Sequence, residues 1–151
     1  MKPICSLIAQ HPFLAELDPA HLAILSDYAM ERTFEDGECI FSQGDTANRF
    51  YLINSGRVCI TSRDTNETTV EIESLGEGDV LGWSWLFEPR QWQFDAHAVG
   101  VTKTIFFYGT PLLVQLEENP AMGYELMKRM ANVTIRRLQS TREKLLSRSP
   151  S

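Results

Sequence analysis

The chain has 151 residues, of which 43% are hydrophobic and 23% charged, and its formal net charge at pH 7 is −6. This length and composition suit one globular domain with its own hydrophobic core. They exclude a membrane-spanning protein, because no apolar run approaches the roughly 20 residues that a transmembrane helix needs.

The N-terminus and the cysteines indicate the compartment. The first residues lack the apolar segment and cleavage site of a secretory signal, so a cytoplasmic protein without membrane contact is expected. Three cysteines, Cys5, Cys39 and Cys59, form no CxxC motif and no Cys/His cluster, so we expect neither a disulfide framework nor a metal site. Cys39 and Cys59 lie within apolar strand patterns, which predicts buried core thiols.

Residues 1–30 are predicted to be helical. Asp18-Pro19 combines an N-cap residue with a proline at the first helical position, which predicts a helix over 20–30. This helix has one apolar face, so we expect it to pack on a larger body.

From residue 31 to about 109 the pattern changes to short strands separated by turns rich in glycine, asparagine and aspartate. The predicted strands are 32–34, 38–41, 49–54, 57–62, 68–73, 94–99 and 104–108. Their regular spacing is typical of an antiparallel sandwich or roll. We therefore predict one domain of the α+β class that is mainly β: a jelly roll over 31–109, N-terminal helices over 1–30 and C-terminal helices over 111–147.

The C-terminal part is predicted to form two helices, over 112–118 and 121–146. Apolar residues cover more than one side of the last helix, whereas a helix packed only on its own domain needs a single stripe. We therefore predict a homodimer through this helix. The expected contact residues are Met127, Met130, Val133 and Leu138. The alternative is a helix that packs both sides on the roll of its own chain.

The last helix is also basic. From Lys128 onward the chain has seven lysines and arginines against one acidic residue, Glu143. Such a helix is typical of a solvated face or of one that pairs with an acidic neighbour, and it can also contact nucleic acid weakly.

The segment 79–99 is the one around which we interpret the rest of the chain. It leaves a strand, turns at Gly82, passes through a loop and enters the next strand. A glycine followed by a helical turn offers free backbone N–H groups to an anion. All three tryptophans, Trp83, Trp85 and Trp92, lie in this segment, so they form either the wall of a ligand pocket or a plug that fills it.

Three motifs carry a resemblance to a known family. They are Phe34-x-x-Gly37-Glu38-x-Ile40-Phe41-x-x-Gly44-Asp45, Phe50-Tyr51-x-Ile53-x-x-Gly56-x-Val58 and Gly78-Asp79-x-x-Gly82. Together they resemble the cyclic nucleotide-binding domain of the catabolite activator (CRP/FNR-like) superfamily over residues 13–145. The resemblance implies a β-roll with N-terminal helices, a hinge helix and a long dimerising helix.

Members of this family that bind cyclic nucleotides carry a phosphate cassette, Gly-Glu-Leu followed further along by Arg-Ser/Thr-Ala. Its glutamate binds the ribose hydroxyl and its arginine neutralises the cyclic phosphate. Here only the glycine and the alanine match. The cassette positions, in order, are Gly82, Trp83 for the glutamate, Ser84 for the leucine, Phe94 for the arginine, Asp95 for the Ser/Thr and Ala96, with a loop one residue longer.

The two side chains that supply most of the ligand chemistry are therefore replaced. A charge-assisted hydrogen bond contributes about 1.5–3 kcal/mol, and a carboxylate at Asp95 near the phosphate would add repulsion. Binding of cAMP or cGMP in the usual pose is not expected, and no cofactor is predicted. Arg90 is the alternative cation, with which the domain would bind a cyclic nucleotide or another small anion at the amides after Gly82. The candidate pocket comprises Gly82, Trp83, Ser84, Arg90, Phe94, Asp95 and Ala96.

No catalytic residues are predicted. His11, His21 and His97 are the three histidines, and the first two belong to the helical N-terminus, so a cupin-type metal set cannot be assembled. Five polar residues follow the long helix instead of a helix-turn-helix, so sequence-specific DNA binding is not predicted. We predict a stand-alone regulatory or sensor module. The alternatives are a true receptor that uses Arg90 and a structural module that docks on a protein partner.

Overall fold

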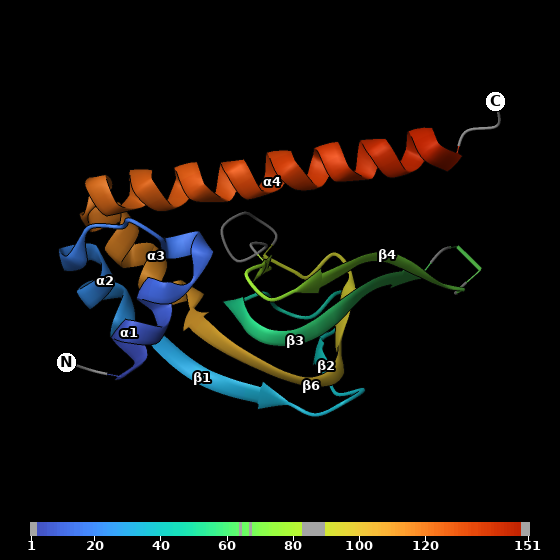
Figure 1. The fold of residues 1–151 in the computed structure, drawn as a ribbon, viewed down its shortest axis with the longest axis horizontal. Helices are drawn as coiled ribbons and strands as arrows, with labels where there is room; N and C mark the ends of the chain where they lie inside the picture. The colour runs from blue at the N-terminus through green and yellow to red at the C-terminus, as the bar shows by residue number, and fades with distance from the viewer. Residues whose placement is uncertain (1–2, 64, 67, 83–89, 149–151) are drawn as a thin grey trace. The chain divides into compact units, whose positions relative to one another are not determined.

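The computed structural model describes residues 3–63, 65–66, 68–82 and 90–148 (Figure 1). The chain divides into two compact units, Met1–Gln115 and Leu116–Ser151. The helices are α1 (Pro3–Gln10), the 3-10 helix η1 (Pro12–Leu14), α2 (Pro19–Ser26), α3 (Gly109–Glu118) and α4 (Pro120–Arg148). The strands are β1 (Ala29–Phe34), β2 (Cys39–Phe41), β3 (Arg49–Arg63), β4 (Thr69–Gly76), β5 (Val80–Leu81) and β6 (Asp95–Tyr108).

The described strands form one antiparallel sheet. Its order is β1-β6-β3-β4, with β2 paired to β6 and β5 paired to β3 (Figure 1). The two long strands β3 and β6 carry most of the pairing, because each contacts three other strands. The predicted antiparallel roll with flanking helices is confirmed.

Two pairs of predicted short strands are each one long strand. β3 covers both 49–54 and 57–62, and β6 covers both 94–99 and 104–108. The predicted turn at Ser55-Gly56 is wrong, because the register shifts there and β3 continues beside β6 as a bulge. Gly56 has a φ of 95°, and a Cβ on it would lie 2.6 Å from the carbonyl oxygen of Val101. A bulge and a turn both favour a glycine with positive φ, so the local pattern did not distinguish them.

The helix predicted over 20–30 is shorter than expected. It begins as predicted, with the Asp18 carboxylate accepting a hydrogen bond from the Ala20 amide at 2.8 Å. It ends at Ser26, and Ala29 and Met30 instead belong to β1, paired with β6. Strand pairing therefore overrides helix propensity at the end of this segment.

Aromatic packing joins the N-terminal helices to the sheet. Phe13 of η1 makes an edge contact with Phe50 of β3, with ring centroids 6.3 Å apart, and Phe50 stacks on Phe107 of β6 at 4.7 Å. Leu52 and Ile105 beside them are fully buried. Each aromatic ring of this kind buries about 150–250 Å², so this cluster fixes the helices at one end of the roll.

Cys39 and Cys59 are not core thiols, contrary to the prediction. Cys39 is exposed and Cys59 is partly exposed. They lie on β2 and β3, each directly opposite His97 of β6, and cross-strand neighbours share one face of a sheet. That face is the outer one, because the alternating residues Ala96 and Ala98 are buried. The thiols point outward because their positions alternate with the inward-facing positions of the strand, even though their sequence neighbours are hydrophobic.

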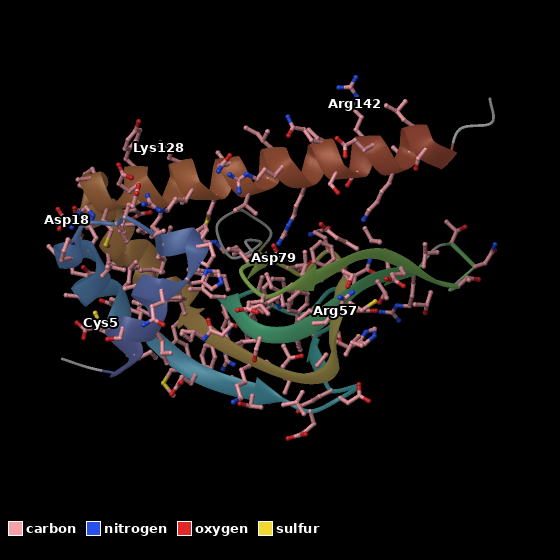
Figure 2. The ribbon with its side chains drawn as sticks, in the orientation of Figure 1. Cys5, Asp18, Arg57, Asp79, Lys128 and Arg142 are labelled. Atoms are coloured by element: carbon pink, nitrogen blue, oxygen red, sulfur yellow. The ribbon has the colours of Figure 1, made fainter. Side chains whose placement is uncertain are left out.

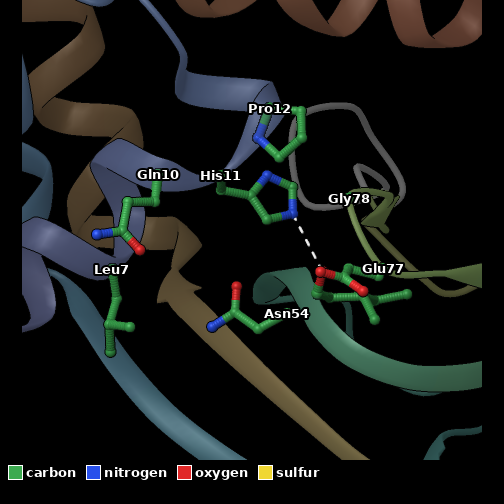
Figure 3. A pocket seen from close by; sticks show the side chains of 8 residues that line it. Leu7, Gln10, His11, Pro12, Asn54, Glu77 and Gly78 are labelled. Atoms are coloured by element: carbon green, nitrogen blue, oxygen red, sulfur yellow. Dashed lines mark hydrogen bonds between the residues drawn. The ribbon is translucent and has the colours of Figure 1, made fainter.

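A cleft of about 590 Å³ is lined by residues of α1, η1, β3 and the turn after β4 (Figure 3). His11 lines it and is 4% exposed. Its Nδ1 accepts a hydrogen bond from the Phe13 amide at 3.1 Å, so Nε2 carries the proton and donates to the Ile53 carbonyl at 3.2 Å. Burial lowers the pKa of His11, against the opposing effects of the hydrogen bond to Ile53 and of Asp79. The neutral ring thus links η1 to β3.

We expect the Gly56→Ala variant to lose about 1–3 kcal/mol of unfolding free energy, because alanine is strained at this φ and its Cβ has no space. Gly37→Ala is the matched control, since Gly37 has a φ of 82° and nothing within 4 Å of its Cβ position. Urea unfolding curves measure both losses. Equal losses would mean that the contact with Val101 costs nothing.

We expect the protein to lose stability as the pH falls below about 6.5, the ordinary pKa of histidine. The pKa of folded His11 is depressed, so in this window the unfolded state binds more protons and stability rises with pH. Urea unfolding at a series of pH values measures the slope. In His11→Asn, which retains an acceptor for the Phe13 amide but does not titrate, this part of the slope should disappear, whereas the control His97→Asn should keep it. An unchanged slope in His11→Asn would contradict the assignment.

Candidate functional site

The segment 90–95, which leads from the cassette into β6, is held against the loop 43–47 between β2 and β3. Three backbone hydrogen bonds join them: Gly44 N–H to the Trp92 carbonyl (2.8 Å), Trp92 N–H to the Asp45 carbonyl (3.0 Å) and Ala47 N–H to the Arg90 carbonyl (2.7 Å). Thr46 and Gln91 form an antiparallel bridge in the middle. This short ladder places the side chains of the segment independently of any ligand.

Trp92 occupies the space beside the cassette glycine. Its side chain is 4% exposed, and its ring stacks on that of Phe41 with centroids 3.8 Å apart and an interplanar angle of 6°. Gly82 has a φ of 84°, and a Cβ there would lie 2.4 Å from the Trp92 ring. The glycine is therefore needed both for its backbone conformation and for the close approach of the indole.

An apolar wall continues from Trp92 along the sheet. Phe94 is partly buried, and its ring lies 6.0 Å from that of Phe41. Ala96, which matches the family pattern, is fully buried and pairs with Phe41 on β2 and with Ile60 on β3. At the arginine position of the cassette, the protein thus has a partly buried phenyl ring beside that of Phe41.

Asp95 points to the other face of β6 from Ala96, as strand alternation requires. Its Oδ1 accepts a hydrogen bond from the Gln43 amide at 2.6 Å, and its Oδ2 lies 3.8 Å from Nε of Arg63. Asp95 lines an outer cleft of about 450 Å³ together with Thr61 and Arg63. The repulsion that we expected between this carboxylate and a bound phosphate is corrected accordingly: Asp95 anchors the 43–47 loop on the outer face.

Arg90 is the cation that the sequence offers as an alternative to the family's arginine. It is half-buried and has a φ of 55°, a conformation that costs a non-glycine residue about 1–3 kcal/mol and persists only where the surroundings hold it. The hydrogen bond from Ala47 to its carbonyl contributes to that restraint. Two predicted pocket residues, Trp83 and Ser84, lie outside the described residues, as do the amides that directly follow Gly82.

Two negative findings concern the part of the chain that the structure describes. No group of three or more histidine, cysteine or acidic side chains is placed there to hold a metal ion. No described helix combines the length and the apolar character needed to cross a bilayer.

Helix α4 carries an exposed apolar seam. It consists of Tyr124, Ala131, Leu138 and Leu145, which are spaced by seven residues, and of Ile135 between them. Leu138 is 69% exposed and Leu145 65% exposed. Lys128 and Arg142, each seven residues from Ile135, share its position in the repeat, and both lie on one side of the helix (Figure 2). This repeat is the one that a pair of coiled helices uses.

One residue predicted for the dimer is unsuitable. Met130 is 5% exposed and belongs to the buried stripe of α4 with Met122 and Leu126. Val133 is partly buried and Met127 is 36% exposed, whereas Leu138 lies in the seam. A side chain already buried within its own chain cannot contact a second copy, so the seam replaces Met130 in the predicted contact.

The comparisons with known proteins agree with this fold. The model of the cyclic nucleotide-binding domain family matches residues 31–119. The chain is 32% identical over 101 residues to the cAMP-dependent protein kinase type II regulatory subunit of Drosophila melanogaster, covering 66% of this chain and 26% of that protein. It is 22% identical over 139 residues to the CRP-like cAMP-activated global transcriptional regulator of Mycobacterium tuberculosis (strain ATCC 25618 / H37Rv), covering 92% of this chain and 60% of that protein.

Among solved structures, a cyclic nucleotide-binding domain from Methylobacillus flagellatus KT has a TM-score of 0.81 at 16% identity, covering 98% of this chain and 83% of that one. At this identity the likeness concerns the fold. The chain spans less than two thirds of the length of either curated relative.

We expect Trp92→Ala to cost about 3–5 kcal/mol of unfolding free energy, because it removes a buried indole and leaves a cavity beside Phe41. Trp92→Phe, which retains a ring to stack, should cost less. Urea unfolding measures both variants. A loss below about 1 kcal/mol for the alanine variant would show that the indole is not an integral part of the packing.

Proposed function

Because the chain belongs to the cyclic nucleotide-binding domain family, we propose that it is a regulatory or sensor module of this type that does not hold cAMP or cGMP in the usual mode. The observation that carries the proposal is the apolar wall of Phe41, Trp92 and Phe94 at the position where the family places its phosphate-binding cation. Both curated relatives are regulatory proteins by their names, which supports a regulatory role without catalysis.

The absence of the family's arginine at position 94 makes phosphate binding costly. A cyclic phosphate at this wall would lose the charge-assisted hydrogen bonds of the family's arginine, each worth about 1.5–3 kcal/mol. It would also be desolvated against an aromatic surface without compensation, which carries a penalty of its own. The indole of Trp92 adds a steric obstacle, since it already packs on Gly82 at the start of the cassette.

Two alternatives make different predictions for ligand binding. A receptor that uses Arg90 as its cation is supported by the restrained, half-buried position of that residue beside the cassette. A structural module with a filled pocket is supported by the Trp92 stack. The titrations below separate these alternatives. A receptor that uses Arg90 must bind a cyclic nucleotide, whereas a filled, structural pocket binds none in any variant that keeps the indole of Trp92.

The seam of α4 supports a second part of the proposal, pairing with another copy of the chain. Apolar side chains that are more than half exposed at a seven-residue repeat are unfavourable in water and are covered when two such helices coil together. Lys128 and Arg142 occupy the same position of the repeat as Ile135, within the seam (Figure 2), so pairing should strengthen as salt screens their repulsion.

We expect no binding of cAMP or cGMP tighter than about 10 μM by isothermal titration calorimetry, which corresponds to about −7 kcal/mol. The double variant Phe94→Arg with Asp95→Ser, which restores the family's arginine and removes the neighbouring negative charge on the outer face, should gain affinity for cAMP by about tenfold or more. Arg90→Ala is the matched control for the alternative cation.

The outcomes distinguish the three readings. Wild-type binding tighter than this limit that is lost in Arg90→Ala would establish the receptor and overturn the proposal. An absence of binding even in the double variant would favour a filled, structural pocket, and adding Trp92→Ala to that variant would show whether the indole is the obstacle.

We expect the double variant Ile135→Glu with Leu138→Glu to shift the chain from dimer to monomer in sedimentation equilibrium. Four carboxylates facing one another in the seam would repel, and the apolar contact would be lost. Asn132→Glu with Gln139→Glu, which adds the same charge to the same helix outside the seam, is the control. A monomeric wild type, or a dimer in both variants, would contradict pairing through α4.

A further inference from the structure

The sheet carries an arginine–aromatic face that the cassette does not use. We define it as Met30, Arg32, Arg49, Tyr51, Phe106 and Tyr108. The register places Met30, Phe106 and Tyr51 in one row across β1, β6 and β3, and it places Arg49 opposite Tyr108. Cross-strand neighbours share one face of a sheet, and Arg32 shares it with Met30 because the two are separated by one residue.

Both guanidinium groups are held in place by stacking on aromatic rings. The Cζ atom of Arg49 lies 4.4 Å from the centroid of the Phe106 ring and 5.4 Å from that of Tyr108. The Cζ atom of Arg32 lies 4.5 Å from the centroid of the Phe34 ring. An arginine held against a ring loses less side-chain freedom when it binds, so both groups are pre-organised.

Tyr51 joins the two cations. Its side chain is buried, and burial raises the pKa of its hydroxyl, while a hydrogen bond to Arg49 and the charges of Arg49 and Arg32 act in the opposite direction. The Tyr51 ring lies 6.1 Å from the ring of Phe34, on which Arg32 stacks, and 5.9 Å from the ring of Phe106, on which Arg49 stacks. The two cations therefore stack on neighbouring rings of one face.

The two cations differ in their pairing. Arg32 forms an ion pair with Glu38 at 2.8 Å, whereas among the residues with assigned positions no carboxylate forms an ion pair with Arg49. A planar guanidinium offers several N–H donors and matches a carboxylate in a bidentate geometry. Arg49 is therefore the member of the face with capacity for a further anionic group.

The charge of the surroundings limits what that anion is. Residues 1–115 contain seven lysines and arginines against 16 aspartates and glutamates. Such an acidic body repels an extended polyanion such as a nucleic acid. A single carboxylate contacting Arg49 gains the local attraction and remains small enough to avoid most of that repulsion.

The exposed residues at the rim of the face favour a ligand that has an apolar side chain beside its carboxylate. Met30 is 47% exposed and Tyr108 39% exposed. A free inorganic anion would leave these side chains in water, whereas an apolar side chain beside a carboxylate would cover them. We propose that this face docks a segment of a partner protein in which an aspartate or glutamate stands next to an aromatic or aliphatic residue, with Arg49 binding the carboxylate. The proposal does not depend on what the roll itself binds.

The test is an NMR titration of the full chain with the blocked peptide acetyl-Asp-Phe-Glu-Leu-amide and with its neutral counterpart acetyl-Asn-Phe-Gln-Leu-amide. We expect saturable amide shifts in β1, at the start of β3 and at the end of β6 with the acidic peptide alone. Arg49→Glu should weaken the affinity by about tenfold or more. Arg57→Glu, the same charge change at an exposed arginine of β3 outside the face, should leave it unchanged.

Arg49→Gln is a second variant that removes the charge without reversing it, and the amide spectrum of each variant reports whether it is folded. Absence of saturable shifts, equal shifts with the neutral peptide, or affinity that survives both Arg49 variants would overturn the proposal. Benzoate binding as tightly as the peptide would overturn it in favour of a plain anion site. Tighter binding of a DNA oligonucleotide at the same residues would overturn it in favour of a nucleic-acid surface.

Discussion

The stack of Trp92 on Phe41 is the interaction on which the interpretation of this protein depends. The indole lies against Gly82, and the ladder between the segment 90–92 and the loop 43–47 holds it there through the backbone. A ring from the chain itself thus covers the glycine that begins the cassette. This contact is the basis of our proposal that the chain does not hold a cyclic nucleotide in the usual mode.

Phe94 and Asp95, which stand where the family pattern has arginine and Ser/Thr, both have a place in the packing of the roll. The phenyl ring joins the apolar wall, whereas the carboxylate leaves the interior and binds the amide of Gln43 on the outer face. A buried carboxylate without a cation would be costly, and strand alternation avoids this cost by directing the side chain outward. The anchoring of the 43–47 loop therefore follows from the direction of the Asp95 side chain.

We propose two surfaces through which this chain contacts other proteins. The seam of α4 is apolar with a seven-residue repeat, and it suits an identical helix. The arginine–aromatic face combines two stacked arginines with an exposed methionine and tyrosine, and it suits an acidic segment. They differ in chemistry and lie on different elements of the chain, so self-association and recognition of a partner can be removed independently by substitution.

The sequence by itself determined the class of fold. Glycines at the turns, strand spacing, the Asp18-Pro19 helix start and the three motifs were enough to predict the roll and its family, because these signals are local and each has a direct backbone cause. It also predicted the positions at which the cassette departs from the family.

Only the tertiary structure decided where those residues point. Alternation along a strand says that Asp95 and Ala96 lie on opposite faces, but the pairing of Ala96 with Phe41 and Ile60 decides which face is inside. The same register exposed Cys39 and replaced the predicted turn at Ser55-Gly56 with a bulge, and the burial of Met130 removes it from the predicted dimer contact. Pairing between strands far apart in the chain leaves no local pattern, which is why these features could not be predicted from the sequence.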